Sequence, residues 1–523
     1  MRGKNKASIF ATPLLPPSRG SGWFSSTGPR FRPPNPGRVA THSLSRAGDD
    51  LPTENFGGNA RFLRPARFPF GKTRGNVCSA LAVDNSALRE ISGRENFFMH
   101  TKMKWAARAA GVLAVVVASA VAGDAKVENW PRWRGPRDNG STETGRYPVT
   151  WSGTTNVLWK AELPGKGCST PIVWEQKIYV TAPVEGQDAL LAFDWAGKKL
   201  WQTPVGAEKP GKHKNGSGSN PSPTTDGAGV FAYFKSGNLA AFGFDGKVLW
   251  RTNLVEKYGR DTLYWDYGCS PVLTETLVVV SMMHHGESWL AAFDKKTGEL
   301  RWKVARNYTT PVENDHSYAT PIVIRHAGAE ALLVWGAEHL TAHSTATGAV
   351  LWTAGDFNPE GKKNWVAVSS FVLAGDLAVV PYGRGSRLHA VKLGGSGDVT
   401  ATHRVWKRED TGTFVPTPAE YKGKVYLVRD RGEVECVDPA TGKTVWSGQL
   451  PKSGANYYSS PTIADGKVYA AREDGVIFVA QIEGKFEVLS ENNMGERVIA
   501  APVPVGNRLL LRGEKNLFCI AAP

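Results

Sequence analysis

The sequence predicts an all-β fold: an eight-bladed β-propeller built from four-stranded antiparallel blades. Two recurring phrases lead to this prediction. In the first, a short apolar run meets a turn with Gly and ends on Trp, as in AFDKKTGELRW (292–302) and CVDPATGKTVW (436–446). In the second, a small or hydroxyl residue, usually followed by Pro, begins a β run, and eight such strand starts occur along the chain. The repeat period, read from the tryptophans, is 40 to 54 residues.

The tryptophan phrase describes one hairpin. Asp294 can accept hydrogen bonds from turn amides, Gly298 supplies the positive φ of the turn, and Leu300 and Trp302 share one face of the next strand. We expect Trp at this place to fix one blade to the next, a structural role. The tryptophans concerned are Trp159, Trp201, Trp250, Trp302, Trp352, Trp406 and Trp446. In the remaining repeat, FEVLSEN, Leu489 takes the place of Trp.

The proline phrase gives the blade count and the closure of the ring. Its first four copies stand around Pro171, Pro221, Pro271 and Pro321, and the fifth has Phe371 instead of Pro. Three more copies follow, VPTPAEY, SSPTI and AAPVP. The Trp159 strand precedes the first copy, and the chain ends without such a strand, so we expect the N-terminal strand to complete the last blade.

The N-terminal part has a different composition. Residues 1–102 are basic and rich in Pro, Gly and Arg, which predicts disorder, and residues 103–123 have the pattern of a signal peptide. Because a signal peptide works only at an N-terminus, we interpret 1–102 as the product of an upstream start, with a genuine long leader as the alternative. The apolar run 109–123 is shorter than the ~20 residues of a membrane span. We therefore expect a propeller over 124–523 in the periplasm or outside the cell, with no membrane span after cleavage and no cysteine for a lipid anchor.

Charge and cysteine content narrow the possible functions. Residues 1–123 hold 18 of the 63 basic residues but 6 of the 48 acidic ones, so the rest of the chain is nearly neutral and nucleic-acid binding is not expected. Cys168 and Cys269 occupy matching places in two repeats, as do Cys436 and Cys519 in two others, which is typical of small buried residues. The sequence has no CxxC, HExxH or Walker motif, and we predict neither a metal site nor a catalytic residue.

Candidate ligand-binding residues come from the segments before the prolines, which we expect near the axis at the channel mouth. Charged or amide residues stand five positions before five of the prolines, and aromatic residues lie close by. The predicted set is Lys166, Asp266, His316, Asn456 and Arg497, with Asp315, Trp265, Tyr267 and Trp365. The alternative is an ordinary solvated channel mouth. The Gly- and Lys-rich loop GAEKPGKHKNGSGSN (206–220) could cover this mouth or simply be solvated.

The A-x-D-x-x-T-G-x-x-x-W phrase resembles the tryptophan-docking motif of the pyrroloquinoline quinone-like (PQQ-like) repeat propellers, and the resemblance covers about residues 127–523. The segment NWPRWRGPRDNGSTETG (129–145) is similar to the opening of secreted bacterial members. That superfamily includes dehydrogenases that hold PQQ above calcium, with a catalytic Asp and a pair of adjacent cysteines. It also includes cofactor-free scaffolds such as the propeller of the outer-membrane β-barrel assembly machinery. This sequence has no Cys-Cys pair and no recognisable calcium ligand set.

The resemblance and the residues together favour a secreted or periplasmic, non-enzymatic binding or scaffold module without a cofactor. Its expected partners are envelope proteins or an extracellular polymer. The alternative is a quinone-dependent oxidoreductase with PQQ and calcium at the mouth and Asp266 or Asp315 as base. A third possibility is carbohydrate binding by the mouth aromatics.

Overall fold

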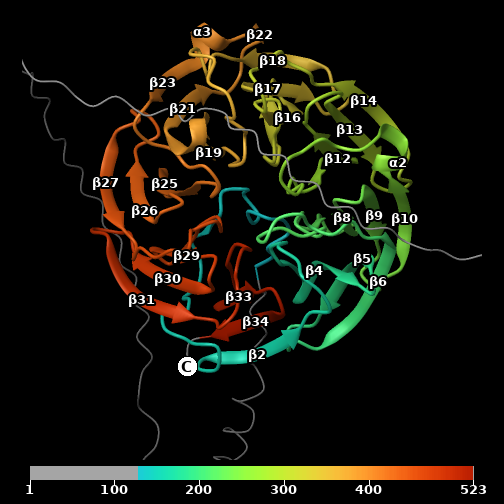
Figure 1. The fold of residues 1–523 in the computed structure, drawn as a ribbon, viewed down its shortest axis with the longest axis vertical. Coiled ribbons are helices and arrows are strands. Elements are labelled where there is room, and N and C mark those ends of the chain that lie inside the picture. The colour runs from blue at the N-terminus through green and yellow to red at the C-terminus, as the bar shows by residue number, and fades with distance from the viewer. Residues whose placement is uncertain (1–127, 522–523) are drawn as a thin grey trace, which may run out of the picture. The chain divides into compact units, whose positions relative to one another are not determined.

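The structure is a computed structural model that describes residues 128–521. The predicted disordered segment and signal peptide lie outside these residues. The described chain forms eight sheets arranged around an axis (Figure 1). This confirms the predicted all-β, eight-bladed propeller. Blades 1 to 8 are numbered here in the order in which their innermost strands occur along the chain.

Each blade starts with a short innermost strand next to the axis. The innermost strands are β3 (Ile172–Trp174), β7 (Thr224–Thr225), β11 (Val272–Leu273), β15 (Ile322–His326), β19 (Val372–Ala374), β24 (Ala419–Tyr421), β28 (Thr462–Ala464) and β32 (Val503–Val505). The second strands are β4 (Lys177–Val184), β8 (Val230–Tyr233), β12 (Leu277–Met282), β16 (Ala329–Gly336), β20 (Leu377–Tyr382), β25 (Lys424–Val428), β29 (Lys467–Ala471) and β33 (Arg508–Arg512).

The third and outermost strands complete each blade. The third strands are β5 (Gln187–Phe193), β9 (Asn238–Phe242), β13 (Trp289–Asp294), β17 (His339–Ser344), β21 (Arg387–Lys392), β26 (Glu433–Val437), β30 (Val476–Gln481) and β34 (Asn516–Ala521). The outermost strands are β6 (Lys199–Ala207), β10 (Val248–Asn253), β14 (Leu300–Ala305), β18 (Val350–Ala354), β23 (Arg404–Arg408), β27 (Thr444–Gln449), β31 (Glu487–Asn493) and β2 (Val157–Glu162).

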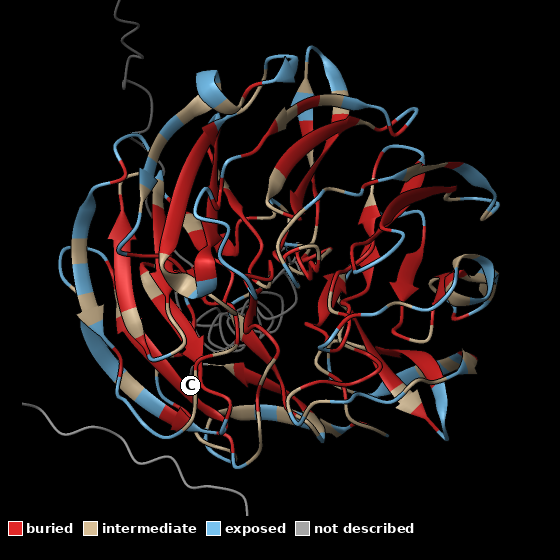
Figure 2. Ribbon diagram, turned by 45° about the horizontal axis from the view of Figure 1, so that its top comes forward, coloured by how far each residue is buried: buried red, intermediate tan, exposed pale blue. Residues whose placement is uncertain are grey.

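Burial follows from the position of a strand in its blade (Figure 2). The second and third strands have neighbouring blades on both faces, so they are almost continuously apolar, as in β12 and β9. The outermost strands alternate between partly buried and exposed residues, as in β2 and β27, because one face meets solvent.

Strands from near both ends of the described chain share blade 8. Strand β2 pairs antiparallel with β34, with Trp159 opposite Cys519, and thus forms the outermost strand beside β34, β33 and β32. Two short strands extend other sheets in parallel: β1 (Ser141–Thr142) pairs with β28, and β22 (Gly397–Asp398) pairs with β18.

In the described part of the chain, helical structure is limited to short connections. It comprises α2 (Leu254–Tyr258), α3 (Thr400–His403) and a 3₁₀ turn (Gly383–Gly385). No helix within 128–521 has the length and apolar character needed to cross a membrane.

The outer-strand tryptophans contact the turn of the following blade. The Trp302 indole N–H donates to the carbonyl of Thr345 at 2.8 Å, and a Cβ at Gly348 (φ 75°) would lie 2.7 Å from the Trp302 ring. The turn therefore needs Gly both for its backbone and for the indole above it. Equivalent indole–carbonyl bonds join Trp159 to Trp195, Trp201 to Phe244, Trp250 to Lys295, and Trp406 to Pro439.

Blade 7 has no tryptophan on its outermost strand. The expectation that Leu489 takes the Trp place is wrong by one residue. Trp302 lies opposite Ala292 just before the register shift of its strand, and Ser490 holds the same position opposite Val479. Leu489 is exposed.

The missing indole of blade 7 is supplied from the N-terminal segment. Trp151 is buried and stacks on Tyr469 at 6.4 Å, much as Trp201 meets Tyr179 at 5.9 Å in blade 1. Its backbone N–H donates to Asn492 Oδ1 at 2.7 Å, and its indole donates to Met494 Sδ at 3.1 Å.

Candidate functional site: the axial cavity and its mouth

A belt of hydroxyl groups surrounds the axis where each blade begins. The N–H of Thr170 donates to Ser222 Oγ at 2.9 Å, the N–H of Ser222 donates to Ser270 Oγ at 3.0 Å, and the pattern continues from blade to blade. The N–H of Ala501 in blade 8 returns to Thr170 Oγ1 at 3.2 Å. This hydroxyl belt consists of Thr170, Ser222, Ser270, Thr320, Ser370, Thr417 and Ser460, and Ala501 completes the circle without a hydroxyl.

The belt corrects the assignment of the second proline phrase. Thr170 precedes Pro171 and Ser270 precedes Pro271, so the equivalent of Ser222 is followed by Pro223. The predicted Pro221 is two residues too early. Both prolines fit the same strand face, and the sequence period could not separate them.

The segment 130–142 closes one end of the channel, and its cyan trace lies near the ring centre in Figure 1. Trp130 pairs with Val173 of blade 1, and Pro131 O accepts the Thr225 N–H of blade 2 at 2.9 Å. On the far side, the Arg134 guanidinium donates to Pro461 O at 2.9 Å and to Pro418 O at 3.1 Å. The part of the sequence that resembles the opening of secreted propellers is thus a plug that ties four blades together.

Above the plug lies a cavity of about 300 Å³, within the size range of small-molecule sites. Trp133 of the plug lines it, together with hydroxyl groups of the belt and aromatic side chains. Other lining residues include Asn215, Asn220, Trp265, Asp266, Tyr318, Phe414, Val415, Tyr458 and Ile499.

One predicted site residue, Asp266, anchors the loop 206–220 on blade 3. Its carboxylate accepts the N–H of Lys212 at 2.8 Å and of His213 at 3.0 Å, and it pairs with the buried Lys235 ammonium at 2.5 Å. Burial alone would raise the pKa of Asp266, but these donors lower it below its usual value. Asp266 is therefore a charged structural anchor that has no free oxygen to act as a base.

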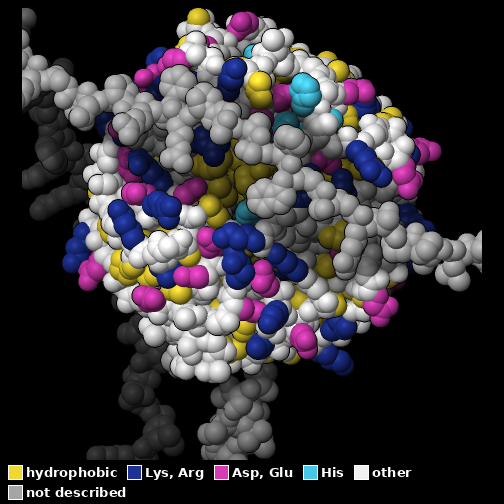
Figure 3. Space-filling model, viewed as in Figure 1, with side chains coloured by type: hydrophobic (Ala, Val, Ile, Leu, Met, Phe, Trp, Pro, Cys, Tyr) yellow, Lys and Arg dark blue, Asp and Glu magenta, His cyan; other side chains and the backbone are white. Residues whose placement is uncertain are grey.

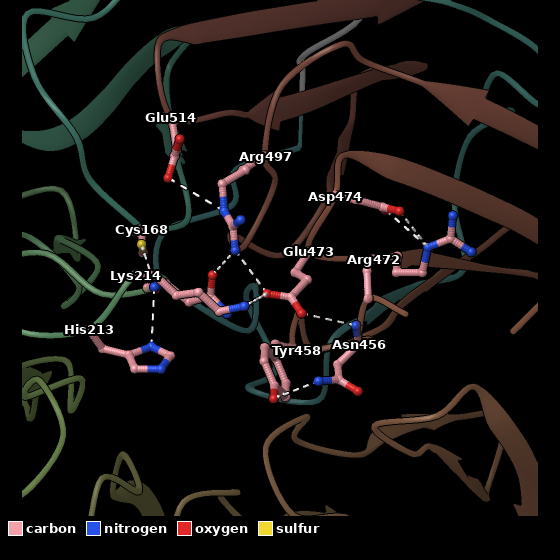
Figure 4. A network of polar contacts seen from close by, with 12 residues as sticks. Cys168, His213, Lys214, Asn456, Tyr458, Arg472, Glu473, Asp474, Arg497 and Glu514 are labelled. Atoms are coloured by element: carbon pink, nitrogen blue, oxygen red, sulfur yellow. Dashed lines mark hydrogen bonds and ion pairs between the residues drawn. The ribbon is translucent and has the colours of Figure 1, made fainter. Parts of the chain in front are cut away.

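The other side of the loop is tied to blades 7 and 8 (Figure 4). Asn215 Nδ2 donates to Glu473 Oε2 at 2.6 Å, and Arg497 donates both to Asn215 Oδ1 and to Glu473 Oε2. Burial would raise the pKa of Glu473, but hydrogen bonds led by that from Asn215 lower it. Lys166 donates to the carbonyl of Lys214 at 2.6 Å, fixing the loop to blade 1 as well. The loop is thus part of the cavity wall.

The structure brings four of the predicted residues together around this loop and separates the others. Lys166, Asp266 and Arg497 contact the loop directly. Asn456 reaches it through Glu473, because its backbone N–H donates to Glu473 Oε1 at 3.1 Å. Asp315 instead meets His285 at 3.1 Å and His316 at 3.9 Å. Burial lowers the pKa of His316. Neither Asp315 nor His316 lines the cavity.

The predicted aromatic residues also differ in access. Trp265 is 37% exposed at the mouth and packs edge-on against His213 at 4.7 Å. Tyr267 is only 2% exposed, with its hydroxyl donating to Ser281 O at 2.7 Å. Trp365 is 7% exposed and belongs to the core between blades 4 and 5. The prediction that Tyr267 and Trp365 contact a ligand directly is therefore wrong, because both are core residues.

Several cavity residues were missed by the sequence analysis. The belt hydroxyls stand in the proline phrase itself, but from the sequence alone a hydroxyl before Pro indicates only the start of a strand. Tyr318 and Tyr458, which lie two residues after His316 and Asn456 in the sequence, also line the cavity. Figure 3 shows hydrophobic side chains near the centre of the face in view, with Lys, Arg, Asp and Glu side chains around them.

The described fold defines the chain as an eight-bladed propeller of the PQQ-like repeat class. The family model described as "Outer membrane protein assembly factor BamB" matches residues 144–263, 244–413 and 396–486, which together make up more than half of the chain. The chain therefore belongs to this family. It is also 25% identical over 374 residues to the outer membrane protein assembly factor BamB of Burkholderia pseudomallei (strain K96243), covering 68% of this chain and 84% of that protein.

Solved structures of enzymes share the fold. A europium-containing methanol dehydrogenase superposes with a TM-score of 0.56 at 11% identity, covering 75% of this chain and 89% of that one. The quinohemoprotein alcohol dehydrogenase from Comamonas testosteroni gives 0.55 at 13% identity, with 76% and 81% covered. At these identities the likeness concerns the fold alone.

Proposed function

We propose that the protein is a non-enzymatic binding scaffold of the cell envelope that uses the cavity mouth as its docking face. The observation that carries this proposal is the pairing of charges around the mouth. Asp266 is neutralised by Lys235, and Glu473 is neutralised by Arg497, with Lys214 at 3.7 Å. Charged side chains that are paired with each other in this way form a fixed surface for a partner. An acid–base catalyst, in contrast, needs a group that is free to exchange protons with a substrate.

The cavity residues do not fit PQQ with calcium. PQQ carries three carboxylates, yet the residues that line the cavity in the described chain include no Lys or Arg. Calcium prefers six to eight oxygen ligands with several carboxylates. Asp266, the one carboxylate in the lining formed by residues 128–521, already accepts hydrogen bonds from three donor groups.

The exposed rim supplies the contact area for a partner. Tyr264 is 62% exposed and packs edge-on against Trp265 at 4.8 Å. Exposed aromatic residues beside a concavity are typical of protein-docking centres, because they bury large areas at low entropy cost. The family relative is named as an assembly factor of outer membrane proteins, which supports an envelope partner. A periplasmic or extracellular location remains part of the proposal.

A pull-down from the envelope fraction of the source cell tests the scaffold role. The mature chain should capture a defined set of proteins, and Trp265→Ala should reduce this capture. Leu249→Ala is the matched control, because Leu249 is 49% exposed on β10 at the outer rim. Equal capture by both variants would contradict a docking role for the mouth. Reduction of a dye on addition of PQQ, calcium and an alcohol would contradict the non-enzymatic role.

A further inference from the structure

The hydrogen-bonding groups of the cavity are unevenly satisfied. Hydroxyl oxygens of the belt, such as Ser270 and Ser460, each accept a backbone N–H, and no acceptor for their own protons occurs among the described residues. The Tyr318 hydroxyl accepts the backbone N–H of Trp265 at 2.9 Å, and the Tyr458 hydroxyl accepts a side-chain N–H of Asn456 at 2.7 Å. No acceptor for either phenolic proton occurs among the described residues. Several O–H donors therefore face one cavity, which calls for a ligand with many oxygen acceptors.

The charge of the cavity restricts the ligand further. Asp266 is paired with a buried Lys235, and no lysine or arginine belongs to the described lining. A ligand that brought its own charge into this enclosure would lose hydration without gaining a counter-ion. A neutral ligand is favoured.

The walls combine this polar ring with flat apolar surfaces. Trp133 lies in the plug, and Trp265, Tyr318, Phe414 and Tyr458 stand on the other sides. Aromatic faces together with hydroxyl and amide donors recognise molecules that have apolar C–H faces and polar edges.

From these three properties we infer that the axial cavity binds a neutral sugar unit, such as the end of an envelope or extracellular polysaccharide. The aromatic side chains stack on the C–H faces of the ring, and the tyrosine and belt hydroxyls donate to its ether and hydroxyl oxygens. The free amide of Asn220, whose Oδ1 is occupied by Ser217, provides a further donor. The rim at Tyr264 and Trp265 then provides a path along which a chain leaves the cavity.

The inference goes beyond the scaffold role, and the two can fail separately. Isothermal titration calorimetry and saturation-transfer NMR on the mature chain would use cellobiose and diacetylchitobiose as neutral probes and glucuronate as the charged probe. We expect at least one neutral disaccharide to bind once per chain. Tyr318→Phe and Tyr458→Phe should each weaken it about three- to tenfold, the value of one neutral hydrogen bond.

Tyr258→Phe is the matched control. Tyr258 of α2 packs on Trp289 of β13 away from the cavity, so this variant should bind sugar as the wild type does. The inference is overturned if no neutral sugar binds at millimolar concentration. It is also overturned if glucuronate alone binds, or if both cavity variants bind as the wild type does. If the wild-type chain binds no neutral sugar but still captures its protein partners, this inference is refuted and the scaffold proposal stands.

Discussion

The Arg497 guanidinium donates to the side-chain oxygen of Asn215, although 282 residues separate them in the chain. This contact joins the loop 206–220 to blade 8 across the mouth, and Glu473 of the β29–β30 turn accepts from both residues. A loop with four glycines that would otherwise sample many conformations is thereby held as one wall of the cavity.

Glu473→Gln should loosen this wall. The change keeps the side-chain size but removes the negative charge that Arg497 and Lys214 share. Hydrogen exchange measured by mass spectrometry should become severalfold faster in residues 213–218, while the part held by Asp266 changes less. The control is Glu487→Gln on β31, which removes an exposed ion pair between Glu487 and Lys485. Unchanged exchange in 213–218 would show that the network does not restrain the loop.

Ala501→Ser should stabilise the protein. In each of the other blades, the belt hydroxyl accepts the backbone N–H of the belt residue in the preceding blade. Ala501 has no hydroxyl that could accept the N–H of Ser460. One added buried hydrogen bond is worth about 1 kcal/mol in free energy of unfolding. Denaturant titration should show this gain, and Ser270→Ala should show a loss of similar size. A destabilised Ala501→Ser would mean that blade 8 lacks room for the belt geometry.

Trp151→Ala should cost about 3 to 5 kcal/mol of folding stability, as truncation of a fully packed Trp does. Trp151 fills the joint between blades 7 and 8 with Tyr469 and Met494. Trp195→Ala is a suitable comparison, because the Trp195 side chain is only partly buried and should cost less. Chemical denaturation of both variants measures the difference. Equal losses of unfolding free energy in the two variants would contradict the role of Trp151 as the packed indole between blades 7 and 8.

His343 should make the protein sensitive to acid. Burial lowers the pKa of His343 to about 4, and the Gly348 carbonyl accepts from its Nδ1 at 2.9 Å. The unfolded state binds a proton from about pH 6.5 downwards, but the folded state does so only near pH 4, so stability falls as the pH drops through this window. The loss approaches about 3 kcal/mol.

The comparison with His343→Gln isolates this contribution, because Asp188 and Asp430 act in the opposite direction. Burial raises the pKa of both aspartates to about 6, so the folded state favours their protonated forms. The change in unfolding free energy from pH 7 to pH 4.5 should be less destabilising in the variant than in the wild type, by up to the contribution of His343. The same pH dependence in both proteins would exclude His343 as a source of acid sensitivity.

The fold was predictable because one local phrase repeats. Turn chemistry around Asp294 and Gly298 and the indole after it recur often enough to reveal blades without any long-range information. Trp151 escaped prediction because it replaces the blade 7 indole from outside the repeat. The equivalent position on β31 holds the small polar Ser490, and the apolar Leu489 stands next to it in the sequence.

The site was less predictable. A fixed offset before each proline found Lys166, Asp266 and Arg497, but it could not show that these residues hold a loop. Such pairings join distant parts of the chain, and they leave no local periodic signal in the sequence.

Site-specific photo-crosslinking in the envelope tests the docking face most directly. A benzoylphenylalanine at position 264, on the aromatic rim, should give discrete protein adducts, whereas one at position 249 on the outer strand should give few or none. Adducts from position 249 with none from position 264 would contradict the proposal that partners bind at the cavity mouth.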